Sequence, residues 1–257
     1  RWFSGAETNQ LATGLTEYLE VGAGSAIVTV TGNDRVHSGT YALKQTSLGQ
    51  VVSSKDNLNA PTLFVRDAVY FQVGANPTVA FDTLVIATIE TGGTQMVGGL
   101  YSHLATDGTL TLRLYDRNGI IAGDSTPIPK DTWLVLDLRV VEHAVYGALT
   151  ARVNGTVVLS YTGRNTGSST MSRANFSGGN NTTGSTTITV FHDDSLVADN
   201  GASGNPTPLP TIYPANGIVM MRRSVPTPLP SPSLNMWTPA PVATSKAYVW
   251  SDTSTTA

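Results

Sequence analysis

The sequence contains no cysteine. Disulfide bonds and thiolate metal sites are therefore excluded. The compartment is left open, because a chain without cysteine can fold in a reducing or in an oxidising environment. Charged residues are also scarce: they make up 13% of the chain, and the formal net charge is −3. No basic field is available to attract a phosphate backbone, so nucleic acid is not an expected partner.

Long apolar runs are missing as well. No run reaches the roughly 18 residues that a membrane-spanning helix needs, so a membrane is not an expected partner. The first residues lack a basic region followed by an apolar stretch, and we expect no signal peptide in the sequence as given. Glutamate and lysine are few, whereas Thr, Gly, Ser and Val are abundant. This composition favours strands and turns over helices.

The sequence contains many short alternating segments separated by turn residues, a pattern typical of a β-sandwich or barrel. The clearest segment is 108–116, whose leucines alternate with polar residues and predict a strand with one wet face. Asn154-Gly155 predicts a tight hairpin turn within 147–163, and Gly92-Gly93 links two further strands. Residues 163–184 are polar, and we expect a long surface loop with one short strand near Phe176. The predicted strands lie at 25–32, 39–47, 61–74, 81–90, 95–104, 108–116, 119–125, 132–141, within 147–163, and at 185–191.

The last part of the chain has a different composition. Most of the prolines follow Asp199, and proline removes ladder donors and favours extended conformations. We therefore expect two parts, a β-sandwich at 1–200 and an extended C-terminal arm at 201–257. The arm carries Trp237, Tyr248 and Trp250, which we expect to dock on the body or on a neighbouring subunit. A flexible tail is the alternative, because a composition rich in Pro and Ser also favours disorder.

Short motifs occur in a fixed order along the chain. They are RWFSGAE (1–7), HSGTYAL (37–43), AVYFQVG (68–74), GTLTLRLYDRNGIIAG (108–123), DTWLVLDLRV (131–140), VNGTVV (153–158), FHDDSLVAD (191–199), YPANGIVMMRRSVP (213–226) and NMWTPAP (235–241). This series resembles the concanavalin A-like (laminin-G-like) jelly-roll proteins of tailed-bacteriophage virions, and the resemblance covers nearly the whole chain. It implies an all-β fold, a two-layer antiparallel jelly-roll sandwich with a proline-rich C-terminal extension.

The resemblance also implies a function, although a fold alone does not fix one. We expect a non-enzymatic structural or decoration component of a tailed-phage virion, assembled in the host cytoplasm, whose partners are its own copies and other virion proteins. The alternative is a carbohydrate-binding module or adhesin, in which case the protein would act outside the cell. Surface glycans would then bind loops around 163–184, where Asn180 and Asn181 are the candidate binding residues.

Catalytic patterns are absent from the sequence. Asp193 and Asp194 are neighbours in a predicted strand, where successive side chains point to opposite faces, so a paired acid/base role is disfavoured. The resemblance associates glycanases of the family with an alternating acidic strand, ExDxxE, and this sequence has no such strand. A GxSxG motif, which would present a nucleophilic serine, is also missing. The four histidines, His37, His103, His143 and His192, are scattered along the chain. We therefore expect no enzymatic activity.

A hard cation is the remaining candidate ligand in the body. The resemblance implies a structural calcium that joins the N-terminal segment to the closing strand, with Glu7 and Asp194 as its ligands. We favour the other interpretation, in which Asp193 and Asp194 accept hydrogen bonds from neighbouring backbone at a strand end and no cofactor is bound. Tyr101, Trp133 and Tyr161 are candidate rings for stacking on a sugar, and burial in the core is the alternative for them.

Overall fold

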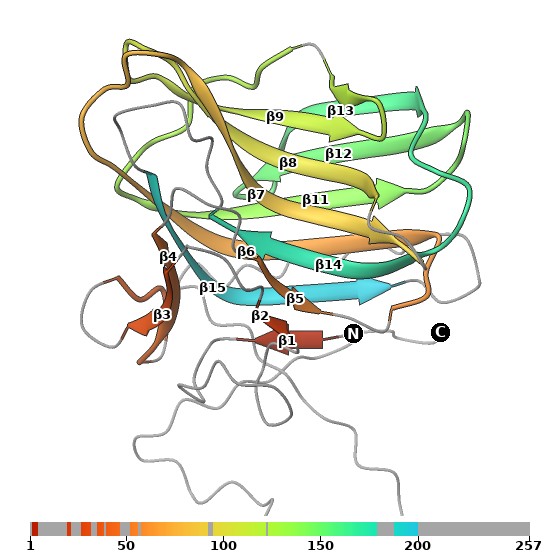
Figure 1. Ribbon diagram of the computed structural model, residues 1–257, viewed down its shortest axis with the longest axis horizontal. Helices are drawn as coiled ribbons and strands as arrows, with labels where there is room; N and C mark the ends of the chain where they lie inside the picture. The colour runs from red at the N-terminus through yellow and green to blue at the C-terminus, as the bar shows by residue number, and fades with distance from the viewer. Residues whose placement is uncertain are drawn as a thin grey trace, which may run out of the picture. The chain divides into compact units, whose positions relative to one another are not determined.

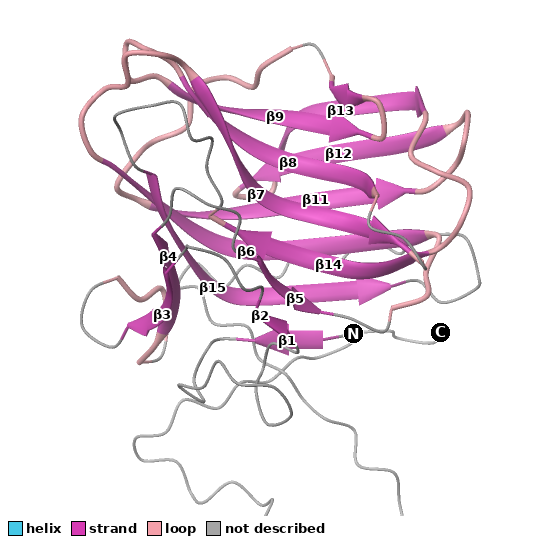
Figure 2. Ribbon diagram, in the orientation of Figure 1, coloured by secondary structure: helices cyan, strands magenta, loops and turns pink. Residues whose placement is uncertain are grey.

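A computed structural model describes a large part of the chain and confirms the expected fold class. Within the residues that it describes, all regular structure is β, and two antiparallel sheets form two layers (Figures 1 and 2). The described residues contain no helix long and apolar enough to cross a membrane. They are residues 2–4, 20–21, 27–31, 35–38, 40–46, 52–55, 58–91, 95–121, 123–178 and 188–199.

Several predicted features lie outside the described residues. These are the calcium ligand Glu7, the loop residues Asn180 and Asn181, and the whole C-terminal arm with Trp237, Tyr248 and Trp250. The division of the chain at residue 200 and the docking of the arm therefore stay predictions.

The first layer, sheet A, contains the strand that closes the sandwich. β6 and β15 pair at its centre. β1 also pairs with β15, although it is not part of the main strand order of the sheet. The predicted segment 61–74 forms one continuous strand, β6, with no break at Arg66-Asp67. In spatial order sheet A contains β13 (Thr156–Arg164), β12 (Gly147–Val153), β11 (Trp133–Val141), β6 (Thr62–Val73), β15 (Ile188–Asp199), β4 (Ala42–Thr46) and β3 (Ile27–Thr31), with β1 (Trp2–Ser4) on β15.

The second layer, sheet B, is built around a meander of three consecutive strands, β7, β8 and β9. The chain crosses from sheet A to sheet B after β6, returns for β11 to β13, and crosses again for β14. In spatial order sheet B contains β10 (Gly119–Ile120), β9 (Leu110–Asp116), β8 (Met96–Leu104), β7 (Phe81–Glu90), β14 (Met171–Ser177), β5 (Val52–Lys55) and β2 (Glu20–Val21).

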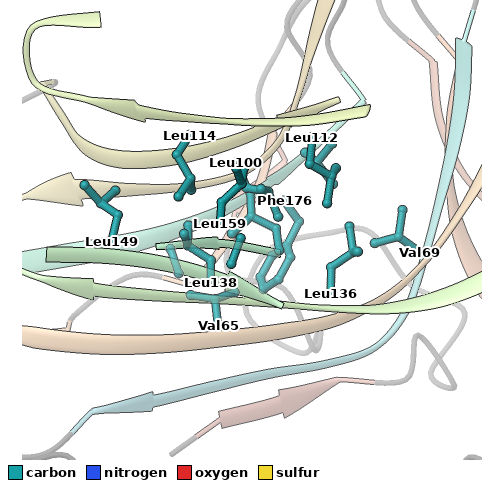
Figure 3. Close-up of a cluster of buried hydrophobic side chains, with 14 of the residues drawn as sticks. Val65, Val69, Leu100, Leu112, Leu114, Leu136, Leu138, Leu149, Leu159 and Phe176 are labelled. Atoms are coloured by element: carbon teal, nitrogen blue, oxygen red, sulfur yellow. The ribbon is translucent and has the colours of Figure 1, made fainter. Parts of the chain in front are cut away.

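The core lies between the two sheets and follows from the period-two alternation of the strands. Each fully buried leucine contributes roughly 1.5–3 kcal/mol relative to an exposed one. The sheets approach closely at Gly98, where a Cβ would lie 2.6 Å from Leu149 Cδ2. Figure 3 shows side chains of the two layers pointing toward one another: Val65, Val69, Leu136, Leu138, Leu149 and Leu159 come from sheet A, and Leu100, Leu112, Leu114 and Phe176 come from sheet B.

The predicted hairpin turn at Asn154-Gly155 is confirmed. Both residues have positive φ, 50° and 83°, which is the conformation that this dipeptide tolerates. The segment 119–125, predicted as a strand, pairs only over β10. Beyond it the chain follows β9 more loosely, with Ser125 donating its backbone N–H to the Leu112 carbonyl at 2.9 Å.

The short strand predicted near Phe176 is confirmed, and it takes up more of the expected surface loop at 163–184 than predicted, from residue 171 to residue 177. This segment forms β14, an interior strand of sheet B that pairs with β7 on one side and β5 on the other. Met171, Ala174 and Phe176 are fully buried in the core. The polar residues between them concealed the length of the strand and its interior position. Two neighbouring strands supply ladder hydrogen bonds, and these stabilise a strand of such a polar composition.

Candidate functional site

The outer surface of sheet B carries a group of polar and aromatic side chains on β7, β8 and β9. Leu110, Leu112 and Leu114 of β9 point into the core, so the residues between them point outward. Strand pairing places His103 opposite Asp82 and Tyr101 opposite Arg113. We call this group the outer cluster: Asp82, Tyr101, His103, Arg113 and Tyr115, together with Asp124 from the segment beside β9.

Asp82 is the centre of the outer cluster. His103 Nδ1 lies 2.8 Å from Asp82 Oδ1, and Arg113 donates to the same oxygen at 3.3 Å. The hydroxyl of Tyr115 donates to Asp82 Oδ2 at 2.6 Å. The Asp82 side chain is 22% exposed, so these three groups shield it only in part from solvent. One carboxylate on β7 thus orients an imidazole from β8 and a guanidinium and a phenol from β9.

Asp124 forms the second anionic part of the outer cluster. Arg113 donates to both of its oxygens, from Nε at 2.6 Å and from the second guanidinium nitrogen at 3.1 Å. This paired bond is the main cause that lowers the pKa of Asp124 and raises the pKa of Arg113. Asp124 is 35% exposed and is close enough to His103 for the imidazole to contribute to the lowered pKa. At neutral pH the Asp124 carboxylate is therefore ionised and accessible.

Tyr101 and Tyr115 stack on each other in the outer cluster. Their ring centroids are 3.9 Å apart, with 29° between the ring planes. The Tyr101 ring lies close to Gly99, where a Cβ would come within 3.0 Å of ring carbon Cε2, so glycine makes room for the ring. Burial is the first cause that raises the pKa of both phenols, and the charge of Asp82 adds to it. Both hydroxyls therefore stay protonated at neutral pH and act as hydrogen-bond donors.

Several groups of the outer cluster remain available for a ligand. His103 Nε2 makes no hydrogen bond to the part of the chain that the structure describes, since only Nδ1 is engaged. The Tyr101 hydroxyl has the Met96 sulfur, a weak acceptor, at 3.9 Å. The outer cluster combines two partly buried rings with an oriented imidazole and an accessible carboxylate. This combination suits a ligand with both apolar faces and hydroxyl groups.

The predicted metal ligand Asp194 lies in a different place, at a bulge in β15. Asp193 accepts backbone N–H groups from His37 and Ser38 through Oδ2, at 2.9 and 3.0 Å, and from Asp194 through Oδ1 at 2.8 Å. Asp194 has a positive φ of 48° and pairs with His37 Nδ1 at 2.8 Å and with the Ser38 hydroxyl at 2.7 Å. The two carboxylates thus hold residues 37 and 38 from within a strand rather than at its end.

These contacts bear on the predicted calcium. Each of the four carboxylate oxygens of Asp193 and Asp194 already accepts a hydrogen bond, so the two residues as placed do not present an open ligand set. Over the described ranges, no three His, Asp or Glu side chains gather closely enough to hold a metal ion. Calcium binding that involves Glu7 stays a prediction.

Burial, and then the charge of Asp194, raises the pKa of Asp193 to about 8 against the effect of its backbone donors.

Three of the four histidines, although scattered in the sequence, each lie beside a carboxylate. His37, His103 and His192 each contact a carboxylate, Asp194, Asp82 and Asp67 respectively. His192 and Asp67 are fully buried between the sheets, with 2.5 Å between Nδ1 and Oδ2.

The Ser195 hydroxyl contributes to the same buried group, and it donates to Asp67 at 2.7 Å. Asp67 therefore lies between the serine and His192, and this group is not a nucleophile activated by a base. Burial is the first cause that raises the pKa of Asp67.

The three candidate stacking rings have different surroundings. Tyr101 belongs to the outer cluster. Trp133 lies on the outer face of sheet A, edge-on to Tyr70 with 5.6 Å between ring centroids and next to His37 at 5.3 Å. Tyr161 packs against the hydrophobic core. Of the three, Tyr101 alone stands in the outer cluster beside an unoccupied imidazole nitrogen and an accessible carboxylate.

Comparison with known proteins supports the fold. No protein-family model matches the chain, and no curated protein sequence matches it. Among solved structures, the cellulose-induced protein Cip1 is similar over 77% of this chain and 97% of its own, with a TM-score of 0.52 and 14% identity. The chain therefore has a two-layer jelly-roll β-sandwich fold, which confirms the fold class expected from the sequence. The phage origin stays a prediction.

Two further similar structures have lower TM-scores. An endo-β-1,4-glucuronan lyase from the fungus Trichoderma reesei is 15% identical over 77% of this chain and 94% of its own, with a TM-score of 0.48. Botulinum neurotoxin type C, whose cell entry depends on interaction with two ganglioside molecules, is 11% identical over 77% of this chain and 47% of its own, with a TM-score of 0.48.

The expectation that the chain is not an enzyme is contradicted by the lyases among the similar structures. The fold is shared by enzymes and by proteins that are not enzymes. Familiar glycanase and hydrolase motifs are missing from the sequence, but this does not exclude activity. Cross-strand pairs such as Asp82 and His103 form without a linear motif.

Proposed function

We propose that the protein binds carbohydrate through the outer cluster. The observation that carries this proposal is the pair of stacked, partly buried tyrosine rings beside an oriented imidazole and an accessible carboxylate. A sugar ring offers an apolar face that packs on an aromatic ring and hydroxyl groups that need donors and acceptors. The outer cluster supplies both on one sheet surface.

The outer cluster is held in place before any ligand arrives. The Tyr115 ring is fixed by its hydroxyl bond to Asp82 and by stacking on Tyr101. His103 is oriented by the same carboxylate, which leaves Nε2 for a sugar hydroxyl. Because these side chains are already ordered, binding loses little side-chain entropy.

The test begins with a glycan array probed with the full chain, followed by affinity measurements on the glycans that bind. Tyr101→Ala removes one ring of the stacked pair, and we expect at least a tenfold loss of affinity, as for a well-packed aromatic residue at a binding site. Tyr146→Ala is the matched control, because Tyr146 is 75% exposed, precedes β12 and lies outside the outer cluster. Its affinity should equal that of the wild type.

A third variant distinguishes glycan binding at the outer cluster from glycan binding at the loop around 163–184, which the sequence suggested. Replacement of Asn180 and Asn181 by alanine should leave affinity unchanged if the outer cluster is the site. A loss in this double variant, with Tyr101→Ala unaffected, would move the site to the loop. Uniform absence of glycan binding would refute the proposal altogether.

A second candidate function is a structural or decoration component of a tailed-phage virion. The observations that favour it are the ordered sequence motifs and the proline-rich region after residue 200. Size-exclusion chromatography of the protein with and without residues 224–257, together with a particle-binding assay, tests this function. Equal monomeric behaviour of both proteins, with no binding to particles, would refute it.

A further inference from the structure

The outer cluster contains more negative than positive formal charge. Two carboxylates, Asp82 and Asp124, face one guanidinium, Arg113. With the imidazole of His103 uncharged the formal sum is −1, and with it protonated the sum is zero. In neither state does the outer cluster carry a net positive charge.

The one fixed cation is already committed within the protein. All three nitrogens of the Arg113 guanidinium donate to a carboxylate, two of them to Asp124 and the third to Asp82. A guanidinium that donates two parallel hydrogen bonds is the best protein partner for a ligand carboxylate, and Arg113 already makes these bonds to Asp124. A carboxylate on a ligand would have to displace Asp124 from Arg113 or lie beside it without a counter-charge.

The groups that remain available suit hydroxyls. His103 Nε2 can donate or accept, the Tyr101 phenol donates, and the Asp124 carboxylate accepts from hydroxyl groups of a sugar. The exposed acceptor among them, the Asp124 carboxylate, requires a partner that donates a hydrogen bond, and a hydroxyl does so whereas an ionised carboxylate does not. We infer that the glycan bound by the outer cluster is uncharged, an inference that rests on the proposed carbohydrate binding.

The inference is tested with pairs of oligosaccharides that differ only at carbon 6 of each sugar, which is uncharged in one member and carries a carboxylate in the other. Cellohexaose is paired with the β-1,4-linked hexamer of glucuronic acid, and β-1,4-mannohexaose with the hexamer of mannuronic acid. In both pairs the hydroxymethyl group at C6 is replaced by a carboxylate. Each glycan that binds in the array is also compared before and after oxidation of its primary alcohols to carboxylates.

We expect the uncharged member of a binding pair to bind at least tenfold more tightly at low salt. The difference should shrink near 1 M salt, where the screening length falls to about 3 Å. Equal or tighter binding of the acidic member would overturn the inference while leaving carbohydrate binding intact. If no glycan of either kind binds, the proposed function fails and the inference fails with it.

A charge variant gives a second and independent readout. Asp124→Asn removes one negative charge and, because the amide keeps only one acceptor oxygen, releases at least one donor nitrogen of Arg113. We expect the acidic member of the pair to gain at least threefold in affinity and the uncharged member to lose affinity. An acidic member that gains nothing would overturn the inference.

Asp131→Asn is the matched control for this variant. It changes the net charge by the same amount at an exposed position before β11, and asparagine tolerates the positive φ of 54° there. Both members of the pair should bind this control as they bind the wild type. Thermal unfolding of each variant verifies that it is folded.

Discussion

Replacing Asp82 by asparagine removes the charge on which the outer cluster is built. Three donors converge on this carboxylate, at 2.8 Å from His103, 3.3 Å from Arg113 and 2.6 Å from Tyr115. The amide of asparagine retains one acceptor oxygen and turns an NH₂ group toward one of the donors. At least one of these bonds is therefore lost, and the remaining bonds no longer have a charged acceptor.

The magnitude follows from the strength and exposure of these bonds. A hydrogen bond to a charged group contributes about 1.5–3 kcal/mol when it is well shielded. Because Asp82 is 22% exposed, we expect a value near or below the lower end of this range, a loss of about 1–2 kcal/mol in the free energy of unfolding. For a domain of this size the loss corresponds to a decrease of about 3–6 °C in Tm.

The assay combines thermal unfolding with a titration of the tyrosines followed by near-ultraviolet absorbance. In the wild type, burial and the bond to Asp82 hold the pKa of Tyr115 far above its ordinary value. In Asp82→Asn the contribution of burial remains and that of the carboxylate disappears, so the pKa of Tyr115 should fall. Tyr115→Phe should lose part of the same stability, and the double variant should lose less than the sum of the two. Unchanged Tm and unchanged titration in Asp82→Asn would refute the arrangement.

Three further predictions concern the core and the bulge of β15. Gly98→Ala places a methyl group 2.6 Å from Leu149 Cδ2, and we expect the crowding to cost about 1–3 kcal/mol in urea unfolding; wild-type stability would show that the sheets are not so close. Asp67→Ala leaves the buried His192 without its carboxylate, and a loss of about 3–5 kcal/mol is expected in the same assay, whereas a loss below 1 kcal/mol would contradict the buried pair. The pKa of Asp193 is raised to about 8 in the fold against an ordinary value of 3.8, so the folded state holds a proton that the unfolded chain releases between these values. Stability should therefore fall as pH rises through this window, by at most about 1.4 kcal/mol per pH unit for one group, and Asp193→Asn should flatten the slope; an identical pH profile in the variant would count against the raised pKa.

Part of the outer cluster could have been found in the sequence. A turn predicted at Gly92-Gly93 with two residues at its tip would place Asp82 opposite His103, and this is the pairing that the structure has. Two register shifts interrupt the β7–β8 pairing, and they cancel before Asp82 is reached. Alternation of the leucines in 108–116 likewise predicted a wet face, on which Arg113 and Tyr115 lie.

Other parts of the site had no local signal. Asp124 reaches Arg113 because the chain after β10 lies beside β9. The sequence of 119–125 predicted a regular strand here, whereas β10 covers only Gly119–Ile120. The pairing of His192 with Asp67 joins residues that are far apart in the chain and depends on β15 lying beside β6. A long-range contact of this kind is set by strand order, which periodicity does not specify.

The sequence by itself determined the all-β class, most strand positions and the hairpin at Asn154-Gly155, because alternation and turn chemistry act over a few neighbouring residues. Only the tertiary structure decided that β14 is an interior strand and that three scattered histidines each face a carboxylate. The physical reason is that hydrogen-bond ladders and side-chain pairs between strands depend on which strands become neighbours and in which register. Strand order and register are determined by the burial of the whole hydrophobic core rather than by any one segment.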